Sequence, residues 1–336
     1  MLQNNMKKIV FFTSTIAGGG AEKQLLKFYQ ILKKDNDCYF YIAKGQSQNN
    51  IKSFEKNKTF FSFFYLIREL LRVRPDILIT TLPTPNFINA IIKKFKILNF
   101  QSVVRIANYN IDLKTTKFII KNSDKIIFNS IENLNLYSKN FPDSIDKFFY
   151  VNNAIDYKYL SRQEKRVSTD NVKALVVSRL TYNKGLDILI NSMNELINEN
   201  LYVDIYGVGP ELDKLRTQSK NNKVNFINKF QDLQHYWKQY NLYILPSRKE
   251  GMSNSLLEAQ FHNIFSVVSD CKTGNKEIIN LTNNGIIFES ENYIDLKSKL
   301  LNFVNNKYRE EKSSTLIGTN FSSENLKSSL LTALGI

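Results

Sequence analysis

Residues 243–258 read Tyr-Ile-Leu-Pro-Ser-Arg-Lys-Glu-Gly-Met-Ser-Asn-Ser-Leu-Leu-Glu. The apolar residues at the start predict a short strand over 242–245, which Pro246 ends. Ser253 and Asn254 are favourable N-cap residues, and the apolar residues behind them predict that a helix begins there. A loop that leads from a strand into a helix offers free backbone N–H groups. The stretch therefore predicts an anion site of the kind that holds a phosphate group.

Two carboxylates, Glu250 and Glu258, lie eight residues apart in this stretch. On one helix they would be roughly 12 Å apart along the axis, at about 1.5 Å per residue. Paired carboxylates that hydrolyse glycosides are roughly 5 to 9.5 Å apart. We therefore interpret them separately, with Glu250 in the loop within reach of a reacting sugar and Glu258 inside the helix within reach of a ribose. Two solvated glutamates on a surface loop and helix are the alternative interpretation.

Length and composition place the chain among ordinary globular proteins. It has 336 residues, of which 43% are hydrophobic and 23% charged, and this predicts two domains of roughly 150 residues each. No apolar run approaches the roughly 18 residues of a transmembrane helix, and the run near the N-terminus is too short for a signal peptide, so we expect a cytoplasmic protein. Two cysteines, Cys38 and Cys271, and two histidines, His235 and His262, predict neither a disulfide framework nor a protein-bound metal.

The positive charge is concentrated in the first half of the chain. The net charge is +15, and residues 1–165 hold 26 Lys and Arg against 13 Asp and Glu. Such a field attracts phosphate-rich partners, either nucleic acid or an anionic membrane surface. Around residues 60–74 basic residues alternate with many aromatic ones. A helix there either packs its apolar face on the core with a solvated basic edge or seats on a bilayer interface.

Short apolar runs alternate with helical patterns in both halves, which predicts doubly wound parallel sheets. In the first half we expect strands at 8–13, 38–43, 77–80, 103–106 and 125–128 and helices near 63–74, 86–95 and 131–139. The alternation restarts at Ala174 after a charged segment, 161–171, that has no apolar periodicity. Ligands of such sheets bind at the carboxyl ends of the strands. This places the polar loops 18–20, 80–84, 105–110 and 129–130 on one rim.

The run from Glu250 to Glu258 resembles the E-x7-E motif of retaining glycosyltransferases with the GT-B fold, in particular the large family 4 that builds bacterial polysaccharides and glycolipids. Residues 18–22, Gly-Gly-Gly-Ala-Glu, resemble the first loop of that family, in which a Gly-Gly pair followed by Ala-Glu faces the donor diphosphate and the acceptor. Residues 178–185 resemble its Gly-Arg-Leu-x-x-x-Lys-Gly motif, whose Arg and Lys hold the diphosphate. Further matches extend the resemblance from residue 8 to about 290, at 152–156, 207–215, 269–277 and 284–288.

The resemblance implies an α/β protein of GT-B architecture, with two doubly wound Rossmann-like domains that face each other across a cleft. We expect an acceptor-binding domain at 1–160, a linker at 161–172 and a nucleotide-sugar-binding domain at 173–318. Residues 319–336 would form a terminal helix that crosses back to the first domain.

The resemblance also implies the activity. A retaining hexosyltransferase would move a hexose or N-acetylhexosamine from a nucleotide diphosphate sugar, with UDP preferred, to a lipid-linked or glycan acceptor in bacterial surface polysaccharide synthesis, such as lipopolysaccharide or capsule. It would need no cofactor and no metal, and would lie on the inner face of the cytoplasmic membrane through its basic first domain. The alternatives are a nucleotide-sugar epimerase of the same fold, which two histidines serve poorly, and a nucleic-acid-binding protein, which no recognition helix, RNP-like strand or zinc spacing supports.

The resemblance assigns the site residues. Catalytic roles fall to Glu250, Arg179, Lys184 and Asn108, and Asn108 stands where many relatives carry a His that faces the reacting sugar. The donor would contact Arg179, Lys184 and Glu250, and also Gly19, Gly20, Phe230, Gly251, Met252, Ser253, Asn254, Leu257 and Glu258. The acceptor would contact Glu22, Thr84 and Arg105.

Overall fold

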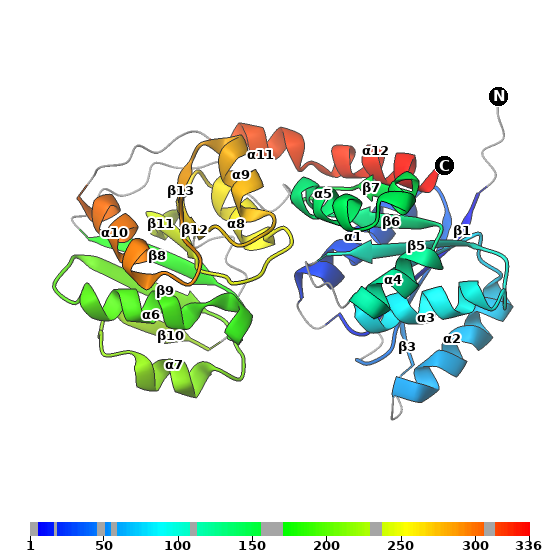
Figure 1. The fold of residues 1–336 in the computed structure, drawn as a ribbon, viewed down its shortest axis with the longest axis horizontal. Helices are drawn as coiled ribbons and strands as arrows, with labels where there is room; N and C mark the ends of the chain where they lie inside the picture. The colour runs from blue at the N-terminus through cyan, green and yellow to red at the C-terminus, as the bar shows by residue number, and fades with distance from the viewer. Residues whose placement is uncertain are drawn as a thin grey trace. The chain divides into compact units, whose positions relative to one another are not determined.

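The computed structural model describes residues 6–16, 19–45, 51–54, 59–107, 113–155, 171–228, 237–305 and 313–336. The chain divides into two compact units, one made of Met1–Ala154 with Ser323–Ile336 and the other of Ile155–Ser322 (Figure 1). The sequence prediction placed the first boundary at residue 160 and the start of the terminal helix at 319. Most of the predicted linker lies outside the described residues.

The first unit is built on a seven-stranded sheet in the order β3-β2-β1-β4-β5-β6-β7, in which each described strand pair is parallel. Because both faces of a parallel sheet are covered, its strands are continuous apolar runs. The strands are β1 (Lys8–Thr13), β2 (Asp37–Ile42), β3 (Ile51–Ser53), β4 (Ile77–Thr81), β5 (Gln101–Ile106), β6 (Lys125–Phe128) and β7 (Phe148–Tyr150).

Alternate residues of β1 show how the helices cover this sheet. Ile9 and Phe11 pack in the core with residues of α1 and α12, whereas Val10 and Phe12 pack with residues of α2 and α3, as the two-residue period of a strand requires. The terminal helix α12 also contacts α1, β6 and β7. The helices of this unit are α1 (Gly20–Leu32), α2 (Thr59–Val73), α3 (Pro83–Lys94), α4 (Leu113–Lys121), α5 (Ile131–Asn140), η1 (Pro142–Lys147) and α12 (Ser323–Leu334).

The second unit contains a six-stranded parallel sheet in the order β10-β9-β8-β11-β12-β13. Its strands are β8 (Val172–Val177), β9 (Leu201–Tyr206), β10 (Val224–Ile227), β11 (Leu242–Leu245), β12 (Phe265–Ser269) and β13 (Gly285–Phe288). Its helices are η3 (Tyr182–Lys184), α6 (Leu186–Glu195), α7 (Leu212–Gln218), η4 (Trp237–Gln239), α8 (Asn254–Phe261), α9 (Asn275–Thr282), α10 (Tyr293–Val304) and α11 (Ser314–Asn320).

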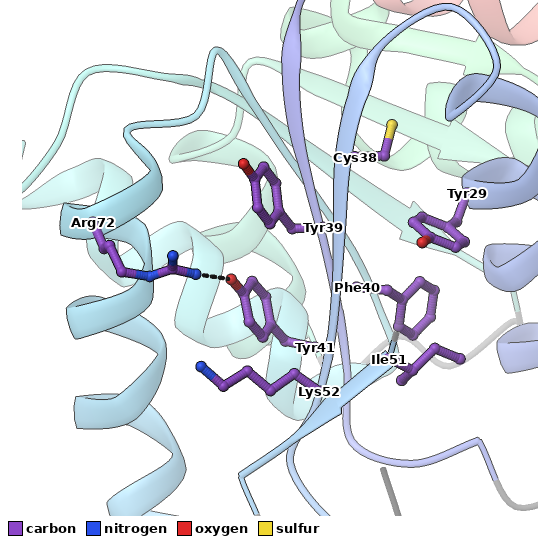
Figure 2. A pocket seen from close by; sticks show the side chains of 8 residues that line it. All are labelled: Tyr29, Cys38, Tyr39, Phe40, Tyr41, Ile51, Lys52 and Arg72. Atoms are coloured by element: carbon purple, nitrogen blue, oxygen red, sulfur yellow. Dashed lines mark hydrogen bonds between the residues drawn. The ribbon is translucent and has the colours of Figure 1, made fainter. Parts of the chain in front are cut away.

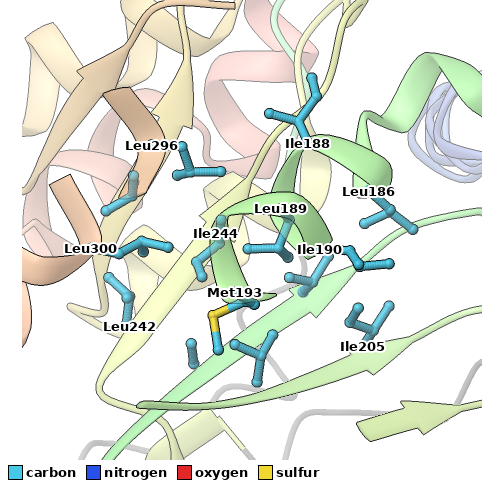
Figure 3. Packing of buried hydrophobic residues seen from close by; sticks show 14 of the residues in the cluster. Leu186, Ile188, Leu189, Ile190, Met193, Ile205, Leu242, Ile244, Leu296 and Leu300 are labelled. Carbon is cyan, nitrogen blue, oxygen red and sulfur yellow. The ribbon is translucent and has the colours of Figure 1, made fainter. Parts of the chain in front are cut away.

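The core of the second unit fixes the helix that follows the first strand. Leu189 and Met193 of α6 pack against Ile244 of β11, and Leu296 and Leu300 of α10 join the same cluster (Figure 3). A second cluster packs α8, α9 and α11 on the other face of the sheet. Burial on both faces holds the carboxyl ends of β8 and β11 side by side.

Both units are doubly wound α/β sheets, so the predicted fold class is confirmed for each of them. In each sheet the strand order changes direction between two neighbouring strands, β1 and β4 in the first unit and β8 and β11 in the second. Such switch points leave a crevice at the carboxyl ends of the strands. Within the described ranges, no helix is long and apolar enough to cross a bilayer.

Candidate functional site

The loop between β11 and α8 has the predicted form. The strand ends at Leu245 before Pro246, and α8 begins at Asn254 with Ser253 as its N-cap. The Ser253 hydroxyl accepts a hydrogen bond from the backbone N–H of Leu256 at 3.4 Å. The start of α8 lies at the carboxyl end of a central strand, where helix N–H groups favour an anion.

The centre of this loop is a buried ion pair. The Lys184 Nζ lies 2.6 Å from Glu250 Oε1, and the side chains are 21% and 9% exposed. The Ser247 hydroxyl donates to the same carboxylate oxygen at 2.7 Å. Lys184 follows β8 and Glu250 follows β11, so the structure brings together two residues that are 66 positions apart in the sequence. Their pairing leaves Glu250 as a fixed acceptor at the rim of the sheet.

A close backbone approach brings the Lys184 turn to this loop. Lys184 ends the short helix η3, and Gly185 follows it in the left-handed region with φ of 62°. A Cβ atom on Gly185 would lie 2.0 Å from the Pro246 carbonyl oxygen. Only glycine fits a left-handed residue in such a contact. Gly185 is therefore the residue that lets the lysine turn lie against the Glu250 loop.

The loop after β12 closes the site from the other side. The Thr273 hydroxyl donates to the Glu250 carbonyl oxygen, and the Ser269 hydroxyl donates to the Ser247 carbonyl oxygen at 2.5 Å. A Cβ atom on Gly274 would overlap the Gly251 carbonyl oxygen. Burial, with the nearby charge of Glu250, raises the pKa of Cys271 to about 11, so this thiol stays protonated and serves as packing.

Glu258 lies inside α8 as predicted, and it is partly buried. The Tyr243 hydroxyl beneath the helix donates to Ser255 Oγ at 2.7 Å. Burial and, to a smaller extent, the charges of Glu250 and Glu258 raise the pKa of Tyr243. The predicted placement of Glu250 in the loop and Glu258 in the helix is therefore confirmed.

The other predicted donor residues are distributed as follows. Arg179 is exposed two residues after the end of β8. Its side chain forms no hydrogen bond or ion pair with the residues that the structure describes. Gly251, Met252 and Leu257 are buried and Asn254 is partly buried. Phe230 lies outside the described residues. The described site therefore combines an exposed arginine, the paired Lys184 and the start of α8.

In the first unit, Gly19 and Gly20 lie at the start of α1, in the stretch that resembles the loop facing the donor diphosphate. Gly19 is the N-cap, with no side-chain cap. The Glu22 side chain is 8% exposed and folds back over Gly19, whose Cβ would lie 2.1 Å from Glu22 Oε2. A carboxylate in this position is stabilised by the helix dipole.

Arg105 lies inside the first unit rather than at its surface. It is 1% exposed, and its guanidinium donates to Asn153 Oδ1 at 2.9 Å and to the Ala21 carbonyl oxygen at 3.5 Å. Burial lowers its pKa to about 10, an effect that the charge of Glu22 opposes. The residue stays charged at neutral pH and joins β5 to the start of α1. Thr84 is exposed in the first turn of α3, and Asn108 lies outside the described residues.

The first unit also contains a hollow that the sequence analysis did not find. It has a volume of about 450 Å³ and lies beside β2, β3 and α2 (Figure 2). Beside it the buried carboxylate of Glu69 accepts from Tyr41 Oη at 3.1 Å, from Arg72 at 2.8 Å and from Lys52 at 3.1 Å. The hollow is lined by Tyr29, Cys38, Tyr39, Phe40, Tyr41, Ile51, Lys52 and Arg72.

A bound metal would need a cluster of ligands. Among the residues that the structure describes, no group of three or more His, Cys, Asp or Glu side chains gathers in one place. His262 is buried and stacks on Trp237, with ring centroids 5.5 Å apart. His235 lies outside the described ranges.

Residues 171–306 match the family model described as Glycosyl transferases group 1. The matched residues lie in the second unit, which is therefore similar to group 1 glycosyltransferase domains. Over almost its whole length the chain is similar to an uncharacterized glycosyltransferase of Haemophilus influenzae, with 23% identity over 330 residues that cover 90% of this chain and 91% of the relative. The glycosyltransferase prediction is therefore supported at the level of the enzyme class.

Two further comparisons cover most of the chain. The GalNAc-alpha-(1->4)-GalNAc-alpha-(1->3)-diNAcBac-PP-undecaprenol alpha-1,4-N-acetyl-D-galactosaminyltransferase of Campylobacter jejuni is 24% identical over 337 residues, 88% of each chain. The crystal structure of HepE from Anabaena in complex with UDP-glucose has a TM-score of 0.80 at 15% identity, over 98% of this chain and 99% of that one. The GT-B fold prediction is confirmed by this structural likeness.

The second unit contains two further residues beside the Lys184–Glu250 pair that the sequence analysis did not assign. Ser247 and Arg248 lie in the stretch 243–258, but the sequence predicted no role for either. The signal was available for Ser247, because a hydroxyl three residues before a loop glutamate is within reach of its carboxylate. The contacts of Arg248 come from residues more than 40 positions away, and no local pattern reveals them.

Proposed function

We propose that the protein is a retaining glycosyltransferase that moves a hexose or N-acetylhexosamine from a UDP sugar to a lipid-linked or glycan acceptor in bacterial surface polysaccharide synthesis. The observation that carries this proposal is the Lys184–Glu250 pair, 2.6 Å apart, beside the start of α8 in a group 1 glycosyltransferase domain. The name of the Campylobacter relative specifies an acceptor on PP-undecaprenol, and HepE was crystallised with UDP-glucose. Both names support the substrate classes.

The donor leaves a nucleotide diphosphate behind, so negative charge builds on its β-phosphate as the anomeric bond breaks. Exposed Arg179, Lys184 and the first N–H groups of α8 supply positive charge and donors for it. One preorganised donor of this kind contributes about 2.7 to 4 kcal/mol to a transition state. The proposed chemistry uses no metal, because these groups stabilise the leaving diphosphate.

Glu250 holds hydroxyls of the transferred sugar in this proposal, and Glu258 accepts hydrogen bonds from the ribose. The Glu250 carboxylate already accepts from Lys184 and Ser247, and such fixed bonds suit a positioned acceptor better than a covalent nucleophile. Transfer would then proceed on one face of the sugar. The leaving phosphate oxygen takes the proton of the acceptor hydroxyl as the new glycosidic bond forms.

We assign the acceptor to the first unit, where Glu22 and Thr84 would contact it and Arg105 would support the start of α1. Arg105 is buried, so it would act by holding the start of α1 and Asn153, whereas Thr84 is exposed at the carboxyl side of β4. Asn108 would donate a hydrogen bond to the reacting sugar. Replacing Thr84 by Ala is expected to raise the KM for acceptor and leave donor affinity unchanged; a rise in donor Kd would contradict the assignment.

We further propose that the first unit docks on an anionic membrane. On α2, Phe64 and Leu71 are 55% and 53% exposed beside exposed Arg68. Directly after α3, the 66% exposed Phe95 follows Lys94, the last residue of that helix. Apolar side chains among basic ones suit a bilayer interface. Flotation with vesicles containing phosphatidylglycerol should retain the protein at low salt, and vesicles of phosphatidylcholine alone should not. Equal binding to both would remove the electrostatic part of this proposal.

The donor site is tested by thermal shift with UDP, GDP, UDP-glucose, UDP-N-acetylglucosamine and GDP-mannose. Ligand at about 100 times its dissociation constant adds about 2.7 kcal/mol to the folded state, so a clear rise in Tm is expected with one nucleotide class. Lys184→Ala and Glu258→Ala should abolish the rise. If millimolar nucleotide of either class leaves the Tm of the parent unchanged, the proposed function fails.

A further inference from the structure

Arg248 uses four of its five N–H bonds inside the second unit. Its guanidinium donates to both carboxylate oxygens of Asp187 at 2.7 Å, to the Tyr182 carbonyl oxygen at 2.8 Å and to Glu291 Oε1 at 2.6 Å. It also lies 4.0 Å from the centroid of the Tyr182 ring. The side chain is only 9% exposed, so solvent screens these contacts less than a surface pair.

These contacts join three loops that follow different strands of one sheet. Arg248 lies after β11, Tyr182 and Asp187 flank the turn after β8, and Glu291 lies after β13. The backbone adds to the link, because the N–H of Arg248 donates to the Asn183 carbonyl oxygen at 2.9 Å. The turn that carries Lys184 is therefore held on both of its sides by a residue that lies two positions before Glu250.

The fork geometry explains why arginine occupies this position. Asp187 lies in the first turn of α6, where a carboxylate is favoured by the helix dipole. Burial acts to raise the pKa of Asp187, but the hydrogen bonds and charge of Arg248 outweigh burial and lower it. Lysine has neither the planar fork nor the face that stacks on a ring, so it does not replace arginine at such a position.

We propose that Arg248 is a positioning residue that sets the contact between Lys184 and Glu250 by holding the turn of η3 against the Glu250 loop. The functional consequence rests on the proposed donor site, where Lys184 and Glu250 would contact the donor in a fixed arrangement. The Arg248 guanidinium binds Asp187 and Glu291, and it forms no described hydrogen bond with Lys184 or Glu250. A misplacement of about 1 Å in such an arrangement is enough to lower a rate about 100-fold.

The first arm of the test does not depend on enzyme activity. Acylation of Lys184 by an N-hydroxysuccinimide ester is followed by peptide mass spectrometry, with Lys214, whose side chain is 64% exposed, as the internal reference. In the parent Lys184 is shielded by its pairing with Glu250. Arg248→Lys should raise the relative acylation rate of Lys184 at least fivefold at a temperature well below the Tm. Glu195→Gln, which removes a remote ion pair with Lys297, is the matched control and should change nothing.

The second arm measures turnover in a double-mutant cycle. Arg248→Lys should lower kcat at least tenfold while the KM for donor changes less than threefold. In a Lys184→Met background the same substitution should lower kcat less than threefold, because residues that act through one another are not additive. A purely structural role would lower the Tm and leave the two effects on kcat multiplicative.

Asp187→Asn serves as the second variant if Arg248→Lys does not fold, because it keeps the shape of the partner and weakens the bidentate bond. It should raise Lys184 acylation at least twofold. The positioning proposal is overturned if Lys184 acylation stays within the error of the parent in whichever variant folds. If instead the parent turns over no nucleotide sugar, the proposed function fails, and the acylation arm still decides the role of Arg248.

Discussion

Glu69 in the first unit and Glu250 in the second are alike in side-chain exposure and in the kinds of groups that contact their carboxylates. Their side chains are 5% and 9% exposed, and each pairs with a lysine, Lys52 at 3.1 Å and Lys184 at 2.6 Å. Each also accepts from a hydroxyl, that of Tyr41 or that of Ser247. Burial and pairing alone do not tell a structural carboxylate from one in a site.

Their surroundings separate the two. Glu69 lies in the second half of α2, and its partners Lys52 and Arg72 are 56% and 58% exposed. The cluster therefore fixes a helix to the edge strand β3 of the sheet. Glu250 lies in the loop between β11, a central strand, and α8, and the exposed Arg179 follows the neighbouring strand β8. Position relative to strand ends and helix starts therefore carries the functional information.

The largest expected effect is on kcat, and it distinguishes the two carboxylates directly. Glu250→Gln should lower kcat for transfer by about 10² to 10³, the range found when one preorganised polar group is removed from an active site. Glu69→Gln should leave kcat within about threefold of the parent. Both are measured as single-donor turnover corrected for folded protein. Equal losses in the two variants would show that the position at the strand end is not what distinguishes them.

The next effect concerns stability and its dependence on pH. Burial acts to raise the pKa of Glu69, but hydrogen bonds from Arg72, Lys52 and Tyr41 outweigh burial and lower it. A carboxyl with a lowered folded pKa stabilises the protein above its unfolded pKa, about 4.3, and this contribution is lost as the pH falls further.

Glu69→Gln should therefore lower the free energy of unfolding at pH 7 by about 1.5 kcal/mol, the low end for hydrogen bonds to charged groups. We expect the low end because Lys52 and Arg72 are exposed and regain water when the carboxylate is lost. Urea unfolding at pH 7 and at pH 3.5 checks this. The difference between parent and variant should shrink at the lower pH. A difference that is the same at both values would show that the ionised form of Glu69 is not favoured by the fold.

The fold was predictable because its signals are local. The apolar run Lys8–Thr13 and the glycines after it predict a buried strand followed by a helix start, and Ser253 predicts the start of α8 correctly. β3 was not predicted, because Ile51–Ser53 is only three residues long. α2 was expected from about residue 63, but it begins at Thr59, since Phe60 and its neighbours show no clear helix start.

The site was predictable in part for the same reason. Arg179, Lys184 and Glu250 occur in contiguous motifs, so their presence at strand ends follows from the sequence. That the Lys184 Nζ contacts Glu250 depends on Gly185 approaching Pro246, which is a tertiary contact. The burial of Arg105 against Asn153 is equally a product of the fold, because a charged residue near the carboxyl end of a strand is expected at the rim.

The smallest effect is expected when one hydroxyl beside each carboxylate is removed, by Tyr41→Phe beside Glu69 or by Ser247→Ala beside Glu250. Burial, with the charge of Glu69, raises the pKa of Tyr41 to about 12, so Tyr41 remains a donor to Glu69 across neutral pH. Tyr41→Phe should lower the free energy of unfolding by about 1 kcal/mol, the usual value of one hydrogen bond, and leave kcat unchanged.

Ser247→Ala should cause a similar loss of stability and in addition lower kcat about fivefold, since about 1 kcal/mol of lost positioning corresponds to that factor. Parallel urea melts and turnover assays of the two variants make the comparison. If Tyr41→Phe lowers kcat as much as Ser247→Ala, the hollow beside β2 contributes to catalysis and the separation of the two clusters fails. If neither variant changes kcat, Glu250 is held by Lys184 alone, and the Ser247 hydroxyl is a structural contact like that of Tyr41.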